Sequence, residues 1–215
     1  MEAASIHHHP AQGASPPAVA ERPLASSWSP ANPAPLGLAA FAMTTFVLSM
    51  FNANLVNEKG VPVVLGLALV YGGIVQLLAG MWEFRTGNTF GAVAFSSFGA
   101  FWISFWALEV FYAKNIGGNV GHSVGVYLWA WAIFTAYMTV AALRVNAAVL
   151  IVFILLTVTF VLLAIGAVGA HTTVTHWGGY LGLATAAVAW YASFAAVVNS
   201  TFGRTVMPLR PLGGH

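Results

Sequence analysis

The sequence contains no cysteine, which excludes disulfides, thiolate metal sites and cysteine chemistry. Charge is also scarce: only 6% of the 215 residues are Asp, Glu, Lys or Arg, against roughly a quarter in soluble domains. Lys and Arg form no cluster, so nucleic-acid binding has no electrostatic basis. No nucleophile–base pair, metal cluster or phosphate loop is recognisable, which makes an enzyme the least favoured class. We expect no cofactor.

Apolar residues dominate instead. They make up 59% of the chain, and the mean hydropathy is +0.82. A helix needs about 20 apolar residues to cross a bilayer. Such runs occupy six ranges: 36–57, 61–82, 89–112, 123–143, 147–169 and 177–199. We therefore predict an all-α, multi-pass membrane protein with six transmembrane helices in a transport domain of residues 32–202.

The two ends of the chain are more polar. Residues 1–31 are rich in Pro, Ala, Ser and His without an apolar core, which predicts a disordered tail rather than a signal peptide. His7, His8 and His9 could bind a metal, but no carboxylate or further ligand lies nearby in sequence. A low-complexity tail or a remnant of cloning is the favoured interpretation. Residues 203–215 are predicted to form a short C-terminal tail.

Cationic residues predict the orientation, because they favour the cytoplasmic side of a membrane. Five arginines fall on the side of the termini, whereas both lysines fall on the other. These residues are Arg22, Arg85, Arg144, Arg204 and Arg210, against Lys59 and Lys114. The distribution places both termini in the cytoplasm, in a plasma or bacterial inner membrane.

Glycines indicate where helices touch. Gly66, Gly73 and Gly80 recur every seven residues on one face of the second span, and Gly178 and Gly182 form a GxxxG pair in the sixth. Small residues let helices in lipid approach closely, either within a chain or at an oligomer interface. The alternative is that glycine is simply common in membrane helices.

Three asparagines reveal an internal repeat. Asn32, Asn88 and Asn146 each precede an apolar run, at intervals of 56 and 58 residues, about the length of one helical hairpin. Repeats of this size are a strong architectural indication in transporters. The simplest arrangement is three hairpins around a pseudo-threefold pore axis.

A bulky apolar residue follows each asparagine after nine or ten positions: Phe41, Phe98 and Leu156. Ten helical residues rise about 15 Å, half of a hydrocarbon core of about 30 Å. If the three helices line an axis, these side chains would close it near the bilayer midplane as a hydrophobic gate. Spacing alone leaves an equal alternative, in which all three face lipid or merely pack.

The first span combines a helix N-terminus that suits an anion with a row of polar residues on one helix face, which we call the polar file. Asn32 is a suitable N-cap and Pro33 is tolerated in a first helical turn, whose free N–H groups suit an anion. Beyond Phe41, a set of small polar residues shares one helix face and resembles a lane leading to the gate. This set consists of Thr44, Thr45, Ser49 and Asn52. Any single hydroxyl could equally bond to its own backbone.

Further polar residues complete the candidate pathway. Gln76 lies mid-span, where a bare amide is costly unless it is paired, so pore lining and interhelical bonding are both open. Asn88, Ser97 and Thr159 belong to the other two helices of the repeat. Glu83, with Arg85, is interpreted as an interfacial pair at a cytoplasmic turn. Glu109 could receive protons or repel anions, although a solvated helix end is favoured.

Several motifs resemble the acetate uptake transporter family, to which bacterial succinate–acetate permeases belong. They are "NPAPLGL" at 32–38, "FAMTT" at 41–45, "GNTFG" at 87–91 and "FGRTVMPL" at 202–209, and the similarity extends over nearly everything after residue 30. The resemblance implies six helices per protomer, a pore through each, and a homo-hexamer. It also implies small monocarboxylate substrates, chiefly acetate, with succinate carried by some members.

The resemblance also bears on the gate. The apolar constriction of the bacterial permease maps onto Phe41, Phe98 and Leu156, which favours the gate interpretation. Phe98 replaces a tyrosine of that permease, so it cannot make any hydrogen bond that the tyrosine hydroxyl makes.

We therefore predict transmembrane transport of acetate and related short carboxylates. The spans lack a central Asp, Glu, Lys, Arg or His, so no buried proton relay is visible. Acetate could instead carry its own proton, and the sequence leaves proton-linked transport and channel-like passage open. The alternatives are passage of another small solute, such as ammonia, formate or urea, and a scaffold or sensor that transports nothing.

Overall fold

The structure, a computed structural model, describes residues 28–213. The predicted His tract and Arg22 lie outside this part of the chain. Six helices within residues 28–213 are long and apolar enough to cross a membrane, as predicted. Apart from one isolated β-bridge, the secondary structure described there is helical. The elements, in chain order, are α1 (Ala34–Asn52), η1 (Glu58–Gly60), α2 (Pro62–Leu69), η2 (Val70–Val75), α3 (Gln76–Thr86), α4 (Thr89–Ala107), η3 (Leu108–Tyr112), η4 (Ala113–Asn115), α5 (Val120–Ala142), α6 (Ala147–Gly169) and α7 (Thr172–Phe202).

Two of the six spans contain wider, π-helical turns. In the second span, η2 separates α2 from α3, and in the third span η3 follows α4. Such turns often mark functional positions, because they redirect the helix and the side chains around them. Here η2 immediately precedes Gln76, and η3 carries Glu109.

The asparagine repeat fixes the starts of three helices at one end of the bundle. The side chains of Asn88 and Asn146 each accept a hydrogen bond from the backbone N–H three residues later, as N-caps do. The first repeat differs by one position, because Pro33 occupies the cap site of α1. Asn32 instead accepts the N–H of Ala34, at 3.0 Å.

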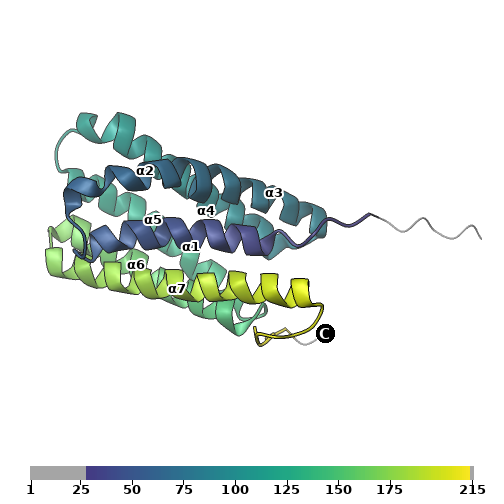
Figure 1. Cartoon of the computed structure of the whole chain (residues 1–215). Helices are drawn as coiled ribbons and strands as arrows, with labels where there is room; N and C mark the ends of the chain where they lie inside the picture. The colour runs from purple at the N-terminus through teal and green to yellow at the C-terminus, as the bar shows by residue number, and fades with distance from the viewer. Residues whose placement is uncertain (1–27, 214–215) are drawn as a thin grey trace, which may run out of the picture.

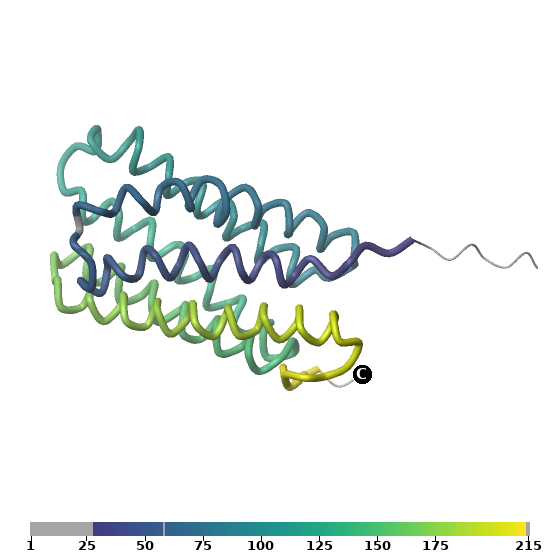
Figure 2. The backbone as a smooth tube through the Cα atoms, viewed as in Figure 1, coloured from purple at the N-terminus to yellow at the C-terminus, as the bar shows by residue number. Residues whose placement is uncertain are grey.

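The helices form a ring in which α5, α6, α7 and α1 follow one another, and the second span then packs on α4 (Figures 1 and 2). Helices α4 and α5 approach closely at only a few positions. Aromatic rings fill the space between them: Phe101 stacks on Tyr127 with centroids 5.9 Å apart and meets the edge of Trp131 at 5.1 Å. The two helices of the middle hairpin, α4 and α5, are therefore splayed apart. The order of the spans along the chain does not predict this separation.

Glycines set the closest helix approaches within the chain. A side chain on Gly80 would collide with Ser96 on α4, and one on Gly178 would collide with Leu163 on α6. Gly182 faces α1 in the same way. Gly66 differs from the others because it has open space around it. The predicted use of glycine for close packing is confirmed, except at Gly66.

At the end of the bundle away from the termini, two predicted spans began too late, whereas the first was predicted to end at 57 and α1 ends at Asn52. Helix α7 begins at Thr172 rather than 177, and α5 begins at Val120 rather than 123. Hydropathy identifies the lipid-crossing part of a helix, whereas these first turns are polar and continue beyond it. The connection between α6 and α7 is reduced to Ala170 and His171.

Both ends of the described chain lie at the same end of the bundle (Figure 1). The segment after α7 folds back onto the α5–α6 turn, where the backbone N–H of Ala147 donates to the carbonyl of Arg210 at 3.0 Å. The side chain of Asn199 accepts two backbone N–H groups of this segment and donates to its Met207 carbonyl. The predicted C-terminal tail is thus ordered through residue 213.

Candidate functional site

The three residues singled out by the repeat lie together in the centre of the bundle. Phe41, Phe98 and Leu156 come from α1, α4 and α6 and are only 5%, 3% and 4% exposed. The rings of Phe41 and Phe98 lie with centroids 5.6 Å apart. The alternative that these side chains face lipid is wrong, because all three are buried inside the ring of helices.

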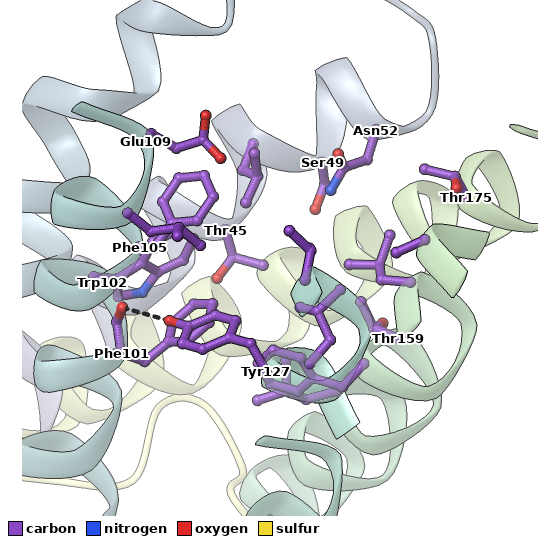
Figure 3. A pocket seen from close by; sticks show the side chains of 18 of the residues that line it. Thr45, Ser49, Asn52, Phe101, Trp102, Phe105, Glu109, Tyr127, Thr159 and Thr175 are labelled. Carbon is purple, nitrogen blue, oxygen red and sulfur yellow. Dashed lines mark hydrogen bonds between the residues drawn. The ribbon is translucent and has the colours of Figure 1, made fainter. Parts of the chain in front are cut away.

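A cavity of about 300 Å³ opens on one side of these residues, toward the end of the bundle away from the termini. We call it the outer cavity. Its walls come mainly from α1, α4, α5 and α6, with Phe41 and Leu156 among the lining residues. Figure 3 shows polar side chains from several helices around it. They include Thr45, Ser49, Asn52, Tyr127, Thr159 and Thr175.

The polar file predicted on the first span mostly faces this cavity. Thr45, Ser49 and Asn52 line it, as their spacing predicts. Thr44 does not, and its hydroxyl donates to the Ala40 carbonyl at 3.0 Å. Its side chain instead packs where a side chain on Gly72 would lie, and it holds α1 against the second span.

A second cavity of about 40 Å³, the inner cavity, lies on the side of the helix N-termini of α1, α4 and α6. Its lining is apolar except for Gln76, which is 1% exposed. Neither the nitrogen nor the oxygen of this amide has a hydrogen-bond partner among the described residues. The interhelical hydrogen bond that the sequence left open for Gln76 is therefore absent among the described residues. The other prediction, that Gln76 lines a pore, is consistent with its place in the inner cavity.

Phe41 and Leu156 line both cavities, and Phe98 lines the inner one. The two cavities therefore meet at these side chains and are separated by them. A solute that moves along the axis from one cavity to the other must displace or pass this apolar contact.

The two acidic candidates lie in different environments. Glu109 lines the outer cavity and is exposed at its rim. Glu83 is 1% exposed, and its carboxylate accepts hydrogen bonds from Asn88 at 2.9 Å and Thr86 at 3.1 Å. The predicted interfacial pair of Glu83 with Arg85 is wrong. Side chains two residues apart on a helix point in directions about 200° apart, so these two do not face each other.

Arg85 has a different partner. Its guanidinium lies 5.7 Å from the ring centroid of Trp28, within range of a cation–π contact. This contact ties the chain before α1 to the end of α3. Glu83 meanwhile connects α3 to Asn88, the cap of α4.

Besides Thr44, four other predicted pathway residues line neither of these two cavities. Asn32 lines a separate groove between α1 and α7, near Ser193. Pro33 is buried at the start of α1, Asn88 is exposed and occupied with Glu83, and Ser97 is half-buried outside both linings. Repeat position alone does not determine which side of a helix faces the axis.

The sequence reasoning missed the aromatic wall of the outer cavity. Phe101, Trp102 and Tyr127 line it from α4 and α5. The sequence does contain a signal for Trp102. It follows Phe98 by four residues, just as Thr45 follows Phe41, so it occupies the equivalent position in the repeat. Within residues 28–213, no three His, Asp or Glu side chains gather as metal ligands would.

Comparison with known proteins agrees with this architecture. The profile of the GPR1/FUN34/yaaH family matches residues 17–212, nearly the whole chain. The chain belongs to this family. A solved structure described as that of the bacterial acetate channel SatP superposes with a TM-score of 0.79 at 39% identity, covering 84% of this chain and 99% of the other.

Proteins with several different names are similar to this chain. The succinate-acetate/proton symporter SatP of Escherichia coli is 39% identical over 180 residues, which are 83% of this chain and 95% of SatP. The ammonia transport outward protein 2 of Saccharomyces cerevisiae is 44% identical over 175 residues, 79% of this chain. The chain spans 62% of the length of the yeast relatives it matches.

Proposed function

We propose that this membrane protein transports acetate and related short carboxylates, succinate among them, through its own bundle. The observation that carries the proposal is the pair of cavities that meet at Phe41 and Leu156. The names of its bacterial relatives, an acetate channel and a succinate–acetate/proton symporter, supply the substrate class. Transport, rather than catalysis, is the activity we assign to this site.

The contact of Phe41, Phe98 and Leu156 acts as the gate. Water is poorly held between apolar side chains, so a closed contact of this kind blocks hydrated solutes. A carboxylate can assemble hydrogen bonds in the outer cavity, which offers the hydroxyl of Ser49 and the amide of Asn52. It loses most of these partners on reaching the gate.

The inner cavity constrains how the charge crosses. Gln76 is its one polar lining residue, and an unpaired ionised carboxylate in an apolar site is strongly disfavoured. The acid can cross with its own proton, or the anion can accept hydrogen bonds from the Gln76 amide nitrogen. The first route gives proton-linked uptake and the second a channel, and the experiment below separates them.

The orientation and assembly belong to the same proposal. Both described ends lie at one end of the bundle, and the excess of arginine there supports the proposal that they face the cytoplasm from a plasma or inner membrane. We further propose a homo-hexamer with one pathway per protomer. Apolar side chains of the second span, including Val63 and Val70, face outward and are available for such a contact.

The test is uptake of labelled acetate into proteoliposomes, with and without an imposed pH gradient. The protein-dependent rate is the quantity measured, because acetic acid also crosses lipid unaided. Accumulation driven by the gradient supports proton-linked transport, whereas equilibration indifferent to it supports a channel. Absence of protein-dependent flux contradicts the proposal and favours a scaffold or sensor.

Matched variants test the gate. Leu156→Ala removes a side chain shared by both cavities, and Ile154→Ala removes one of equal size that is 46% exposed on the outer face of the same helix. We expect faster equilibration in Leu156→Ala and unchanged flux in Ile154→Ala. Equal flux in both variants would place the gate elsewhere. Monodispersity by size-exclusion chromatography controls for misfolding.

Ammonia is a second candidate substrate, favoured by the name of the yeast relative and by the apolar gate, which an uncharged small molecule crosses with little dehydration. Stopped-flow alkalinisation of liposomes by an ammonium pulse measures its passage. Ammonia flux without acetate flux would replace the carboxylate proposal.

A further inference from the structure

One buried threonine in the outer cavity differs from the others. Buried Thr44, Thr135, Thr159 and Thr185 each donate a hydrogen bond to the carbonyl four residues earlier. Thr45 is only 6% exposed, yet its hydroxyl has no partner among the described residues. A threonine in a helix normally satisfies its hydroxyl in this way, so the exception leaves a donor directed into the cavity.

A second unpartnered donor lines the same cavity. Trp102 is 2% exposed, and its indole N–H makes no hydrogen bond within the described chain. Figure 3 shows Trp102 and the Thr45 hydroxyl near the same end of the cavity, beside Phe101 and Tyr127. Tyr127 is already engaged, because its hydroxyl donates to the Phe101 carbonyl at 3.2 Å.

The two donors occupy equivalent levels on two helices of the repeat. Thr45 lies four residues beyond Phe41, and Trp102 lies four residues beyond Phe98. Four helical residues rise about 6 Å, so both donors stand one turn outside the gate. The equivalent position on α6 is Phe160, which supplies an apolar wall.

We propose that Thr45 and Trp102 form a binding subsite for a small carboxylate anion immediately outside the gate. The indole N–H can only donate, so its ligand must present an acceptor, and a carboxylate presents two oxygens to two donors. The cavity's apolar walls strengthen hydrogen bonds to an ionised group. Glu109, the charged residue in this lining, lies at the exposed rim rather than at this depth.

This subsite deepens the proposed function and rests on it for the class of ligand, but it can be tested by binding alone. The protein, ¹⁵N-labelled at its eight tryptophans and purified in detergent, gives indole N–H resonances, among which Trp102→Phe identifies that of Trp102. Sodium acetate is titrated at constant ionic strength and near-neutral pH, with sodium chloride and acetamide as probes lacking either the carboxylate or its charge.

We expect acetate to move the Trp102 indole resonance saturably, and chloride and acetamide to move it far less. Thr45→Val should raise the half-saturating acetate concentration about tenfold, the loss typical of one hydrogen bond to an ionised group. Thr185→Val is the matched control, because it removes a buried hydroxyl that is bonded to the Leu181 carbonyl and lies outside both cavities. It should leave acetate binding within about twofold.

Three results separate this inference from the proposed function. A Trp102 resonance that acetate leaves unmoved overturns the subsite and assigns the two donors to water. Equal losses in Thr45→Val and Thr185→Val also overturn it. Saturable binding at Trp102 in a protein that carries no acetate supports the subsite and contradicts transport.

Discussion

The approach of α3 to α4 sets the position of Phe98, and it can be tested with one methyl group. An ideal Cβ on Gly80 would lie 2.5 Å from the backbone nitrogen of Ser96 and 3.0 Å from its Cα. Ser96 lies two residues before Phe98. Ordinary contact begins near 3.4 Å, so the backbones must separate by about 0.9 Å (3.4 minus 2.5) in Gly80→Ala.

Gly66→Ala is the matched control, because a Cβ there has no neighbour within 4 Å. Both changes replace glycine by alanine in the same span, so the gain in helix propensity of about 1 kcal/mol is common to both and cancels. The remaining difference is the cost of overpacking, typically about 1–3 kcal/mol. For a chain of this size, 1 kcal/mol corresponds to roughly 2–4 °C in Tm.

Gly80→Ala should therefore melt about 2–12 °C below Gly66→Ala. The assay is thermal unfolding of the purified proteins in one detergent, followed by intrinsic fluorescence at one scan rate, since membrane proteins often unfold irreversibly. Coinciding melting temperatures would refute the close approach at Gly80, and with it this account of how α4 is positioned.

Three further predictions concern the end of the bundle near the termini. Ser193→Ala removes the 2.7 Å hydrogen bond from this hydroxyl to the Pro35 carbonyl and should cost about 1 kcal/mol, measured as a lower Tm. Asn199→Ala removes three hydrogen bonds to the C-terminal segment, and faster hydrogen exchange confined to residues 203–213 should follow. Glu83→Ala leaves the amide of Asn88 without its 2.9 Å acceptor and should cost about 1–3 kcal/mol, while Glu83→Gln, which retains an acceptor oxygen, should cost less.

Much of the fold could be predicted because lipid imposes simple rules on a chain. Six runs of sufficient length specify six helices, and asparagine before a run specifies a cap, as at Asn88 and Asn146. The same spacing predicts that Phe41, Phe98 and Leu156 lie at one level. Their burial together follows from the repeat, because equivalent helices present equivalent faces to a common centre.

The rest depends on rotation about each helix axis and on spacing between helices, which hydropathy does not record. Thr44 and Thr45 are neighbours, yet about 100° of rotation places one against the second span and the other in the cavity. The repeat predicts Ser97 on the pathway, but its neighbour Phe98 lines the inner cavity and Ser97 lines neither cavity. The gap between α4 and α5 depends on bulky rings, so adjacency in sequence did not predict it.

The two sides of the proposed gate differ in the hydrogen bonds they offer, and this difference bears on the mechanism of the proposed transport. The outer cavity presents hydroxyls, an amide and an indole, so a carboxylate can exchange its water there for protein donors. The inner cavity presents Gln76 alone, whose amide has no partner of its own. A dehydrated anion that leaves the outer donors thus meets a single donor group beyond the gate. If transport follows the proposed path, that asymmetry makes passage past Phe41 and Leu156 the step at which either a proton or the amide of Gln76 must compensate the charge.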